Sequence, residues 1–171
     1  DILPKDKQST DMYWESSEDV EAILAQGYSR LRACVPYIIN WGELRGSSVI
    51  VPNRGTGTGL IQNFQALPSM TTVQWGTFYQ VIGMANAVLK YAPTVMDKDA
   101  SYYESRMNSH LTEAYFLRGL SYLYLVRNFR EVPLITEPYV DDAMPNDVAK
   151  SSETEILELI KSDVRAALAT N

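Results

Sequence analysis

The sequence predicts an all-α domain of tetratricopeptide-like helical pairs that are interrupted by long loops. Apolar residues recur at helical spacing in four separate stretches of the 171-residue chain. Two long stretches without this periodicity separate the helices, and the helix starts lie farther apart than the regular tetratricopeptide repeat of about 34 residues. Helical pairs with insertions are therefore favoured over a plain up-and-down bundle.

The composition favours one folded domain over residues 1–171. Apolar residues make up 46% of the chain and charged residues 21%, which is typical of a globular protein. The net charge is -6 and the 15 Lys and Arg residues are scattered, so nucleic acid is not an expected partner. The single cysteine, Cys34, excludes an internal disulfide, and neither a metal site nor a cofactor is expected.

The first helix is expected after an extended lead over residues 1–15, which is polar and contains a proline. Ser16 and Ser17 can cap this helix, and Pro36 is expected to end it. No stretch of the chain reaches the roughly 20 apolar residues that would span a bilayer. The predicted buried stripe of the first helix consists of Val20, Ile23, Leu24, Tyr28, Leu31 and Val35.

A long loop is predicted over residues 37–72. Helical periodicity is lost there, and turn-forming Gly, Pro, Asn and Ser residues dominate 45–59. Loops of this length inside compact domains are usually functional or mobile. This loop is therefore the first place to expect a ligand.

The second helix is expected to be capped by Thr71 or Thr72 and to end just before Pro93. Its buried stripe is rich in aromatic residues, and core packing is the favoured interpretation for them. The stripe contains Trp75, Phe78, Tyr79, Ile82, Asn86 and Leu89.

The third helix should start near Asp99 or Ser101 and run to about Asn128. Apolar residues surround nearly its whole circumference, which predicts a helix covered on several sides, with Tyr122 and Tyr124 in the core. Asn86 and Arg118 interrupt the otherwise apolar second and third helices. They are expected to hydrogen-bond to neighbouring loops or to each other.

Three prolines within residues 129–150 predict an extended connection to the last helix. Ser152 and Glu155 stand three residues apart, as the reciprocal hydrogen bonds of a capping box require. The predicted buried stripe of this helix consists of Ile156, Leu159, Ile160, Val164, Ala167 and Leu168.

Three stretches resemble one protein family. Residues 113–135 resemble the segment by which SusD and RagB proteins are recognised, a helix of the form E-A-x-F-L-R-A with an aromatic-rich continuation and a G-x-V-P-L turn. Gly119 replaces the usual alanine, and Arg130 and Glu131 stand where glycine and aspartate are common. Residues 75–89 resemble the family's W-x-x-x-Y-x-x-I-x-x-A-N-x-x-L helix. Residues 151–168 resemble its following E-I-x-x-x-I-x-x-D-L-x-x-A helix, with Val164 in place of the leucine.

The resemblance implies a surface-exposed outer-membrane lipoprotein that binds oligosaccharides or polysaccharides without transforming them. Such proteins deliver glycans to a SusC-like, TonB-dependent transporter. Family members are far longer, so residues 1–171 correspond to the amino-terminal part of such a protein. Leu3-Pro4 resembles the start of the mature chain shortly after a lipidated cysteine, so the expected membrane contact is a lipid anchor outside these residues.

Candidate ligand residues come from the 37–72 loop, because the family's inserted region contributes to its glycan surface. Sugar binding needs aromatic planes for pyranose faces and amide or guanidinium groups for hydroxyls. The alternative for Trp41 and Phe64 is that they anchor the loop to the helices. The predicted ligand-binding residues are Tyr37, Trp41, Arg45, Asn53, Arg54 and Asn63.

No catalytic residue is predicted. His110 is the only histidine and lies in a helix, so a structural role is favoured. The glycines of residues 55–59 lack the lysine of a phosphate-binding loop, and Asp141-Asp142 is interpreted as a solvated turn and not as a calcium site. Two alternative functions stay open. One is a helical protein-protein interaction scaffold whose glycan site lies in the missing carboxy-terminal part, and the other is a glycan-processing enzyme.

Overall fold

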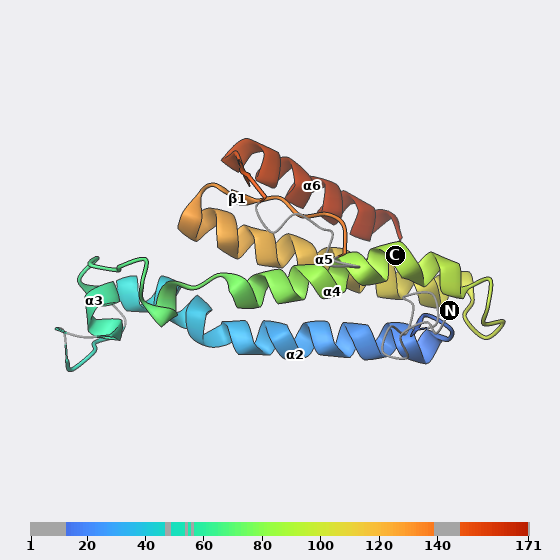
Figure 1. Cartoon of the computed structure of the whole chain (residues 1–171), viewed down its shortest axis with the longest axis horizontal. Helices are drawn as coiled ribbons and strands as arrows, with labels where there is room; N and C mark the ends of the chain where they lie inside the picture. The colour runs from blue at the N-terminus through green and yellow to red at the C-terminus, as the bar shows by residue number, and fades with distance from the viewer. Residues whose placement is uncertain (1–12, 47–48, 54, 56, 139–147, 171) are drawn as a thin grey trace, which may run out of the picture.

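The computed structural model describes residues 13–46, 49–53, 55, 57–138 and 148–170. Four long helices lie side by side: α2 (Ser17–Gly42), α4 (Gly76–Val95), α5 (Glu104–Phe129) and α6 (Glu153–Ala169) (Figure 1). Helix α2 packs against α4, α4 against α5, and α5 against α6, so neighbours in the chain are neighbours in space. The predicted all-α fold of helical pairs is confirmed.

Helix α2 continues through Pro36 to Gly42, so the predicted end at this proline was wrong. Pro36 removes one helical hydrogen bond, but Pro36 and Arg32 are both exposed, and water can hydrate the Arg32 carbonyl that loses its donor. Beyond the proline, Trp41 and Leu44 are only 5% exposed. Burial of these side chains offsets the cost of the proline.

Helix α4 also differs from its prediction at both ends. Thr71 and Thr72 belong to a short 3-10 helix, η2 (Thr71–Val73), and α4 itself begins after Trp75. Pro93 lies inside α4 and not beyond it. The Pro93 side chain faces solvent, whereas Ala92 and Val95 are fully buried, so packing holds the last turn in helical form.

Helix α5 starts at Glu104, a few residues after the predicted start. Asp99 closes the preceding turn instead, because its Oδ1 accepts hydrogen bonds from the backbone N–H of Ser101 at 2.8 Å and from the Ser101 hydroxyl at 2.7 Å. Its Oδ2 accepts from the backbone N–H of Ser17, the first residue of α2, at 3.0 Å. Asp99 thus joins the turn before α5 to the start of α2.

The core lies between the helices and includes Val20, Leu24 and Phe78 from the predicted stripes and Tyr122, which was also expected there. It further contains buried residues outside those stripes, such as Val81. The stripes of α2 and α6 are narrower than predicted. Four members of those stripes are exposed. They are Tyr28 at 39%, Val35 at 44%, Val164 at 52% and Leu168 at 72% exposure.

The predicted loop over residues 37–72 is partly helical. Its first residues belong to α2 and to a 3-10 helix, η1 (Glu43–Arg45), and a short helix, α3 (Thr58–Gln62), lies within it. Thr71 and Thr72 belong to η2, and the remaining described residues have no regular structure. Figure 1 shows α3 and the described residues around it projecting beyond one end of the helical bundle. We call this part the α3 segment (residues 46, 49–53, 55 and 57–70).

After α5 the chain forms a short antiparallel pair of strands, β1 (Val132–Pro133) and β2 (Lys150–Ser151), with Val132 opposite Ser151. The described residues between α5 and α6 contain no helix, as the prolines predicted. Asp141 and Asp142 lie outside the described residues. At the start of α6, Ser152 Oγ accepts a hydrogen bond from the Glu155 N–H and the Glu155 carboxylate accepts from the Ser152 N–H, so the predicted capping box is confirmed.

Candidate functional site

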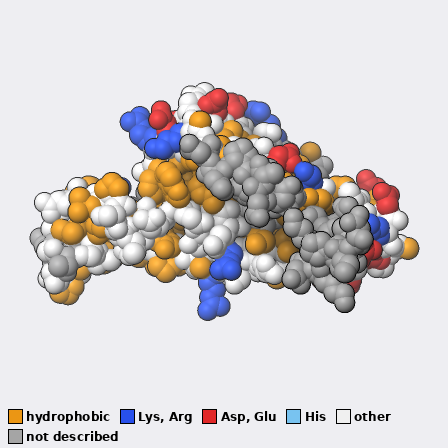
Figure 2. Space-filling model, in the orientation of Figure 1, with side chains coloured by type: hydrophobic (Ala, Val, Ile, Leu, Met, Phe, Trp, Pro, Cys, Tyr) orange, Lys and Arg blue, Asp and Glu red, His pale blue; other side chains and the backbone are white. Residues whose placement is uncertain are grey.

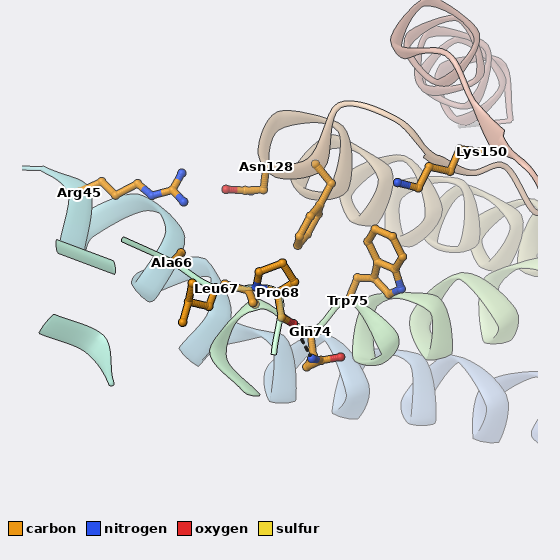
Figure 3. Close-up of a pocket in the computed structure, with 10 residues that line it drawn as sticks. Arg45, Ala66, Leu67, Pro68, Gln74, Trp75, Asn128 and Lys150 are labelled. Atoms are coloured by element: carbon orange, nitrogen blue, oxygen red, sulfur yellow. Dashed lines mark hydrogen bonds between the residues drawn. The ribbon is translucent and has the colours of Figure 1, made fainter. Parts of the chain in front are cut away.

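A pocket of about 520 Å³ opens where the end of α5 meets the chain that leads into α4. Figure 3 shows the side chains that surround it. They come from η1, the α3 segment, η2 and the residues that lead from it into α4, the end of α5, and the start of β2. We call it the Trp75 pocket. It is lined by Arg45, Ala66, Leu67, Pro68, Val73, Gln74, Trp75, Asn128, Phe129 and Lys150.

Trp75 supplies a half-buried aromatic plane in this pocket. Its ring meets Phe129 edge to face, with ring centroids 5.1 Å apart and planes at 75°. Tyr79, one turn along α4, contacts it in a similar T-shaped arrangement at 6.4 Å. Two aromatic neighbours therefore fix the orientation of the Trp75 ring before any ligand arrives.

Polar groups surround this aromatic plane. The Lys150 amine lies 5.9 Å from the centroid of the Trp75 ring, within the range of a cation–π contact. Asn128 donates a hydrogen bond from Nδ2 to the Tyr124 carbonyl at 2.7 Å, which leaves its Oδ1 as an acceptor for other groups. Figure 3 shows Arg45 extending toward Asn128 from one side of the pocket, with Lys150 on the other.

Two smaller hollows adjoin the Trp75 pocket. One of about 350 Å³ shares Arg45 and Asn128 with it and adds Glu43 and Arg127. Another of about 500 Å³ shares Phe129 and Lys150 and adds Arg130, Glu131 and Glu153. Figure 2 shows hydrophobic side chains gathered on this end of the bundle, with charged side chains beside them. The mixture of apolar faces and hydrogen-bonding groups suits a polyhydroxylated ligand.

The predicted site residue Trp41 is only 5% exposed. Its Nε1 donates a hydrogen bond to the Thr72 carbonyl at 2.8 Å, and its ring stacks on Phe78 at 5.3 Å and meets Phe129 edge to face. Tyr37 is half-buried, with its ring centroid 5.7 Å from that of Trp41. This packing favours an anchoring role for both residues, and ligand binding by them stays a prediction.

The other predicted residues fall in two places. Arg45 lines the Trp75 pocket. Asn53 and Asn63 are exposed on the α3 segment, where Asn53 Oδ1 accepts a hydrogen bond from the Gly55 N–H at 3.1 Å. Arg54 lies outside the described residues. Neither Asn53 nor Asn63 lines the Trp75 pocket, so the structure does not bring the six predicted residues together.

The sequence interpretation missed Trp75, Asn128 and Lys150. Trp75 fits the apolar stripe of α4, and this pattern favours core packing. Its position at the very start of the helix, next to a long loop, is the signal that it could also be reached from solvent. Lys150 becomes part of the site only because β2 pairs with β1, and this long-range pairing leaves no mark in the local sequence.

A buried polar network supports the chain that runs from β1 away from the pocket. Asn86 Nδ2 donates to the carbonyls of Ile135 at 3.0 Å and Glu137 at 3.3 Å, and its Oδ1 accepts from Arg118 at 2.8 Å. Arg118 also binds both oxygens of Asp163 on α6, at 2.6 and 2.9 Å. The expected hydrogen bonds of Asn86 and Arg118 to a neighbouring loop and to each other are confirmed.

The described residues offer no obvious catalytic or metal centre. No group of three or more His, Cys, Asp or Glu side chains among them could hold a metal ion. His110 Nδ1 lies 2.9 Å from the Tyr102 hydroxyl, and burial lowers the pKa of His110 below its usual value. This buried pair far from the Trp75 pocket is best explained by packing. None of the described helices has the length and apolar character needed to cross a membrane.

Residues 5–170 match a SusD-like protein family described as starch-binding and associating with the outer membrane. The chain belongs to the SusD-like family. The resemblance seen in the sequence is thereby confirmed.

This SusD-like chain is 29% identical to SusD-like protein P38 of Formosa agariphila, over 98% of its own length and 32% of that protein. It is 25% identical to SusD-like protein P2 of the same organism, over 91% of its own length and 31% of that protein. The chain thus spans about a third of the length of the curated relatives it matches.

Solved structures show the same architecture. A laminarin-binding SusD-like protein superposes with a TM-score of 0.71 and 27% identity, over 91% of this SusD-like chain and 34% of that protein. A SusD superfamily protein from Bacteroides fragilis superposes with a TM-score of 0.72 and 26% identity, over 92% of this chain and 31% of that protein. NanU of B. fragilis superposes with a TM-score of 0.78 and 22% identity, over 99% of this chain and 34% of that protein. This likeness concerns the fold alone.

Proposed function

We propose that this chain supplies part of the glycan-binding surface of a SusD-like protein, and that the Trp75 pocket contacts the sugar. The observation that carries the proposal is a half-buried indole whose orientation is fixed by Phe129 and Tyr79 and which is surrounded by Arg45, Asn128 and Lys150. The family description and the laminarin-binding relative support the same class of ligand.

The physical roles of these groups differ. The Trp75 ring stacks against the apolar face of a pyranose ring, which contributes through buried area and contact with the π system. Asn128, Arg45 and Gln74 then satisfy hydroxyls that would otherwise lose their hydrogen bonds to water. Because hydration of the hydroxyls offsets much of this contact energy, we expect modest affinity for each sugar unit.

In the full-length protein we infer non-enzymatic capture of oligosaccharides at the cell surface and delivery to a TonB-dependent transporter. The family's association with the outer membrane supports this location. We further propose that a lipid anchor outside the present residues holds the protein there. Ligand contacts by the predicted residues Tyr37, Trp41, Asn53, Arg54 and Asn63 belong to the same proposal.

The proposal is tested by calorimetry of the full-length protein with a panel of oligosaccharides. Trp75→Ala should weaken binding about tenfold, the effect of losing about 1.4 kcal/mol of stacking and burial. Tyr103→Ala is the matched control, since Tyr103 is an exposed aromatic residue (62%) at the opposite end of α5. Equal binding by both variants and the unmodified protein would place the sugar elsewhere.

A second function, protein-protein contact, is favoured by an apolar groove between α5 and α6. The groove has a volume of about 280 Å³. Phe116 is 52% exposed and Leu168 72% exposed, which is costly for large apolar side chains that lie together. The groove, which we call the α5/α6 groove, is lined by Tyr115, Phe116, Gly119, Leu120, Leu123, Ile160, Val164, Ala167 and Leu168.

We propose that the remaining part of a full-length SusD-like protein covers this groove. The curated relatives are about three times as long as the chain, so a full-length member has ample polypeptide for the purpose. Apolar residues at helical spacing on both walls suit a further amphipathic helix laid along the groove. In this arrangement the chain also acts as a scaffold for the rest of its own protein.

A further inference from the structure

The Trp75 pocket is positively charged, although the 171-residue chain has a negative net charge. The chain has 15 Lys and Arg residues against 21 Asp and Glu, a net charge of -6. Among the described residues that line the pocket, Arg45 and Lys150 are cationic and none is a carboxylate. The local charge therefore has the opposite sign to the global charge.

Neither cation is neutralised by a described carboxylate. Among the described residues, the cationic partners of ion pairs are Lys90, Lys98, Arg106, His110, Arg118, Arg130 and Lys161. Arg45 and Lys150 take part in none of these pairs. Lys150 instead lies over the Trp75 ring. A cation held at an aromatic plane, with none of the described acids paired to it, is available to an anionic ligand on that plane.

The adjoining hollows do not reverse this charge. In one of them Arg127 adds a further cation beside Arg45, and Glu43 is its one described acid. In the other, Glu153 lies 3.5 Å from Arg130 and is partly neutralised by it. Glu131 is the remaining described carboxylate there. Across the three hollows, the cations outnumber the acids, and the excess is concentrated at the Trp75 pocket.

We propose that the Trp75 pocket prefers acidic glycans, in which a sugar carries a carboxylate or a sulfate ester. The inference rests on the proposed function and names its ligand class. Arg45 offers a planar guanidinium that can bind two oxygens of a carboxylate or sulfate at once, and Lys150 offers a point charge. Because they lie on opposite sides of the pocket (Figure 3), the two cations flank a sugar stacked on Trp75.

The experiment compares acidic glycans with neutral derivatives of the same backbone. The full-length protein is titrated with oligomers of polygalacturonate and their methyl esters, with sulfated galactan and its desulfated form, and with neutral laminarin. At least one acidic member should bind about tenfold more tightly than its neutral counterpart at low salt. The preference should shrink in about 1 M salt, where the screening length is about 3 Å. The pair that shows the preference tells carboxylate from sulfate.

The double variant Arg45→Gln/Lys150→Gln removes both charges and keeps hydrogen-bonding side chains. It should remove the preference, so that the acidic glycan and its neutral derivative bind to this variant with affinities within about twofold of each other. Lys161→Gln is the matched control, because Lys161 is an exposed cation on α6 that does not line the pocket. If the unmodified protein binds acidic and neutral members equally, the inference is overturned while glycan binding stands. The same holds if the preference survives in the double variant. Absence of binding to every glycan overturns the proposed function as well.

Discussion

At the residue scale, the most consequential contact is the buried ion pair between Arg118 on α5 and Asp163 on α6. Both side chains are almost inaccessible to water, at 10% and 2% exposure. Two hydrogen bonds to the carboxylate and a third to Asn86 compensate the loss of hydration. Because Asn86 in turn holds the carbonyls of Ile135 and Glu137, a single guanidinium joins three helices to the connection that follows β1.

Removal of one partner of this pair should be strongly destabilising. Asp163→Ala leaves a buried guanidinium without its counter-charge, and we expect the free energy of unfolding to fall by about 3–5 kcal/mol. Urea denaturation followed by circular dichroism measures the loss. The double variant Arg118→Leu/Asp163→Leu should lose less stability than the sum of the losses measured for Arg118→Leu and Asp163→Leu alone. Additive losses would show that the two side chains contribute independently.

A second residue-scale prediction concerns acid stability. Hydrogen bonds from the Ser101 hydroxyl, and then from the backbone N–H groups of Ser17 and Ser101, lower the pKa of Asp99 to about 2 from 3.8. A depressed pKa in the folded state means that Asp99 contributes stability above the unfolded pKa, and that this contribution is lost as the pH falls from about 4 to 2.

Asp99→Asn should therefore flatten the dependence of unfolding free energy on pH between about 4 and 2. Denaturation midpoints of the two proteins, measured across that range, test the expectation. Asp97→Asn is the control, since Asp97 is an exposed neighbour in the same turn. An unchanged slope in Asp99→Asn would mean that its hydrogen bonds do not stabilise the folded state.

At the element scale, tertiary packing extends helices beyond the signals that end them in the sequence. Pro36 and Pro93 both lie inside helices, because the turns that follow them bury Trp41 and Val95. The existence of the four long helices was predictable from periodicity, since each keeps an apolar stripe toward its neighbours. Their ends were less predictable, because the decisive contacts come from residues distant in the chain.

Replacement of Pro36 tests this explanation. Pro36→Ala restores the missing N–H to an exposed part of α2, and we expect the protein to become more stable by about 1–3 kcal/mol. The midpoint of urea unfolding measures the change. Val35→Ala is a suitable control, because this neighbouring side chain is 44% exposed and its replacement leaves the backbone N–H groups of the helix unchanged. A loss of stability in Pro36→Ala would mean that the proline sets the direction of the end of α2.

At the scale of the whole molecule, the proposed ligand surface and the α5/α6 groove occupy different parts of the bundle. The Trp75 pocket forms where elements distant in the sequence converge, so sequence reasoning found Arg45 but not its partners. The family motif located the helices that frame the pocket. Trp75, the aromatic residue in the pocket, follows the same helical periodicity as the core residues, so the pattern did not distinguish it from them. What separates Trp75 from Phe78 is exposure, which depends on the complete fold.

The α5/α6 groove gives a prediction about the complete protein. Leu168→Cys places a thiol on the groove wall at a position that is 72% exposed in this chain. A water-soluble maleimide should modify it rapidly in the isolated chain and at least about tenfold more slowly in the full-length protein, where we expect the groove to be covered. The native Cys34 should interfere little, because it is fully buried and burial raises its pKa to about 12.

Ser162→Cys is the matched control, since Ser162 is exposed on another side of α6 and does not line the groove. It should react at similar rates in both proteins. If Leu168→Cys reacts as fast in the full-length protein as in the chain, the groove stays open there and is free for a separate partner. Protection of Leu168→Cys alone would instead show that the apolar wall is an internal surface, and that the folded chain scaffolds the rest of its own protein.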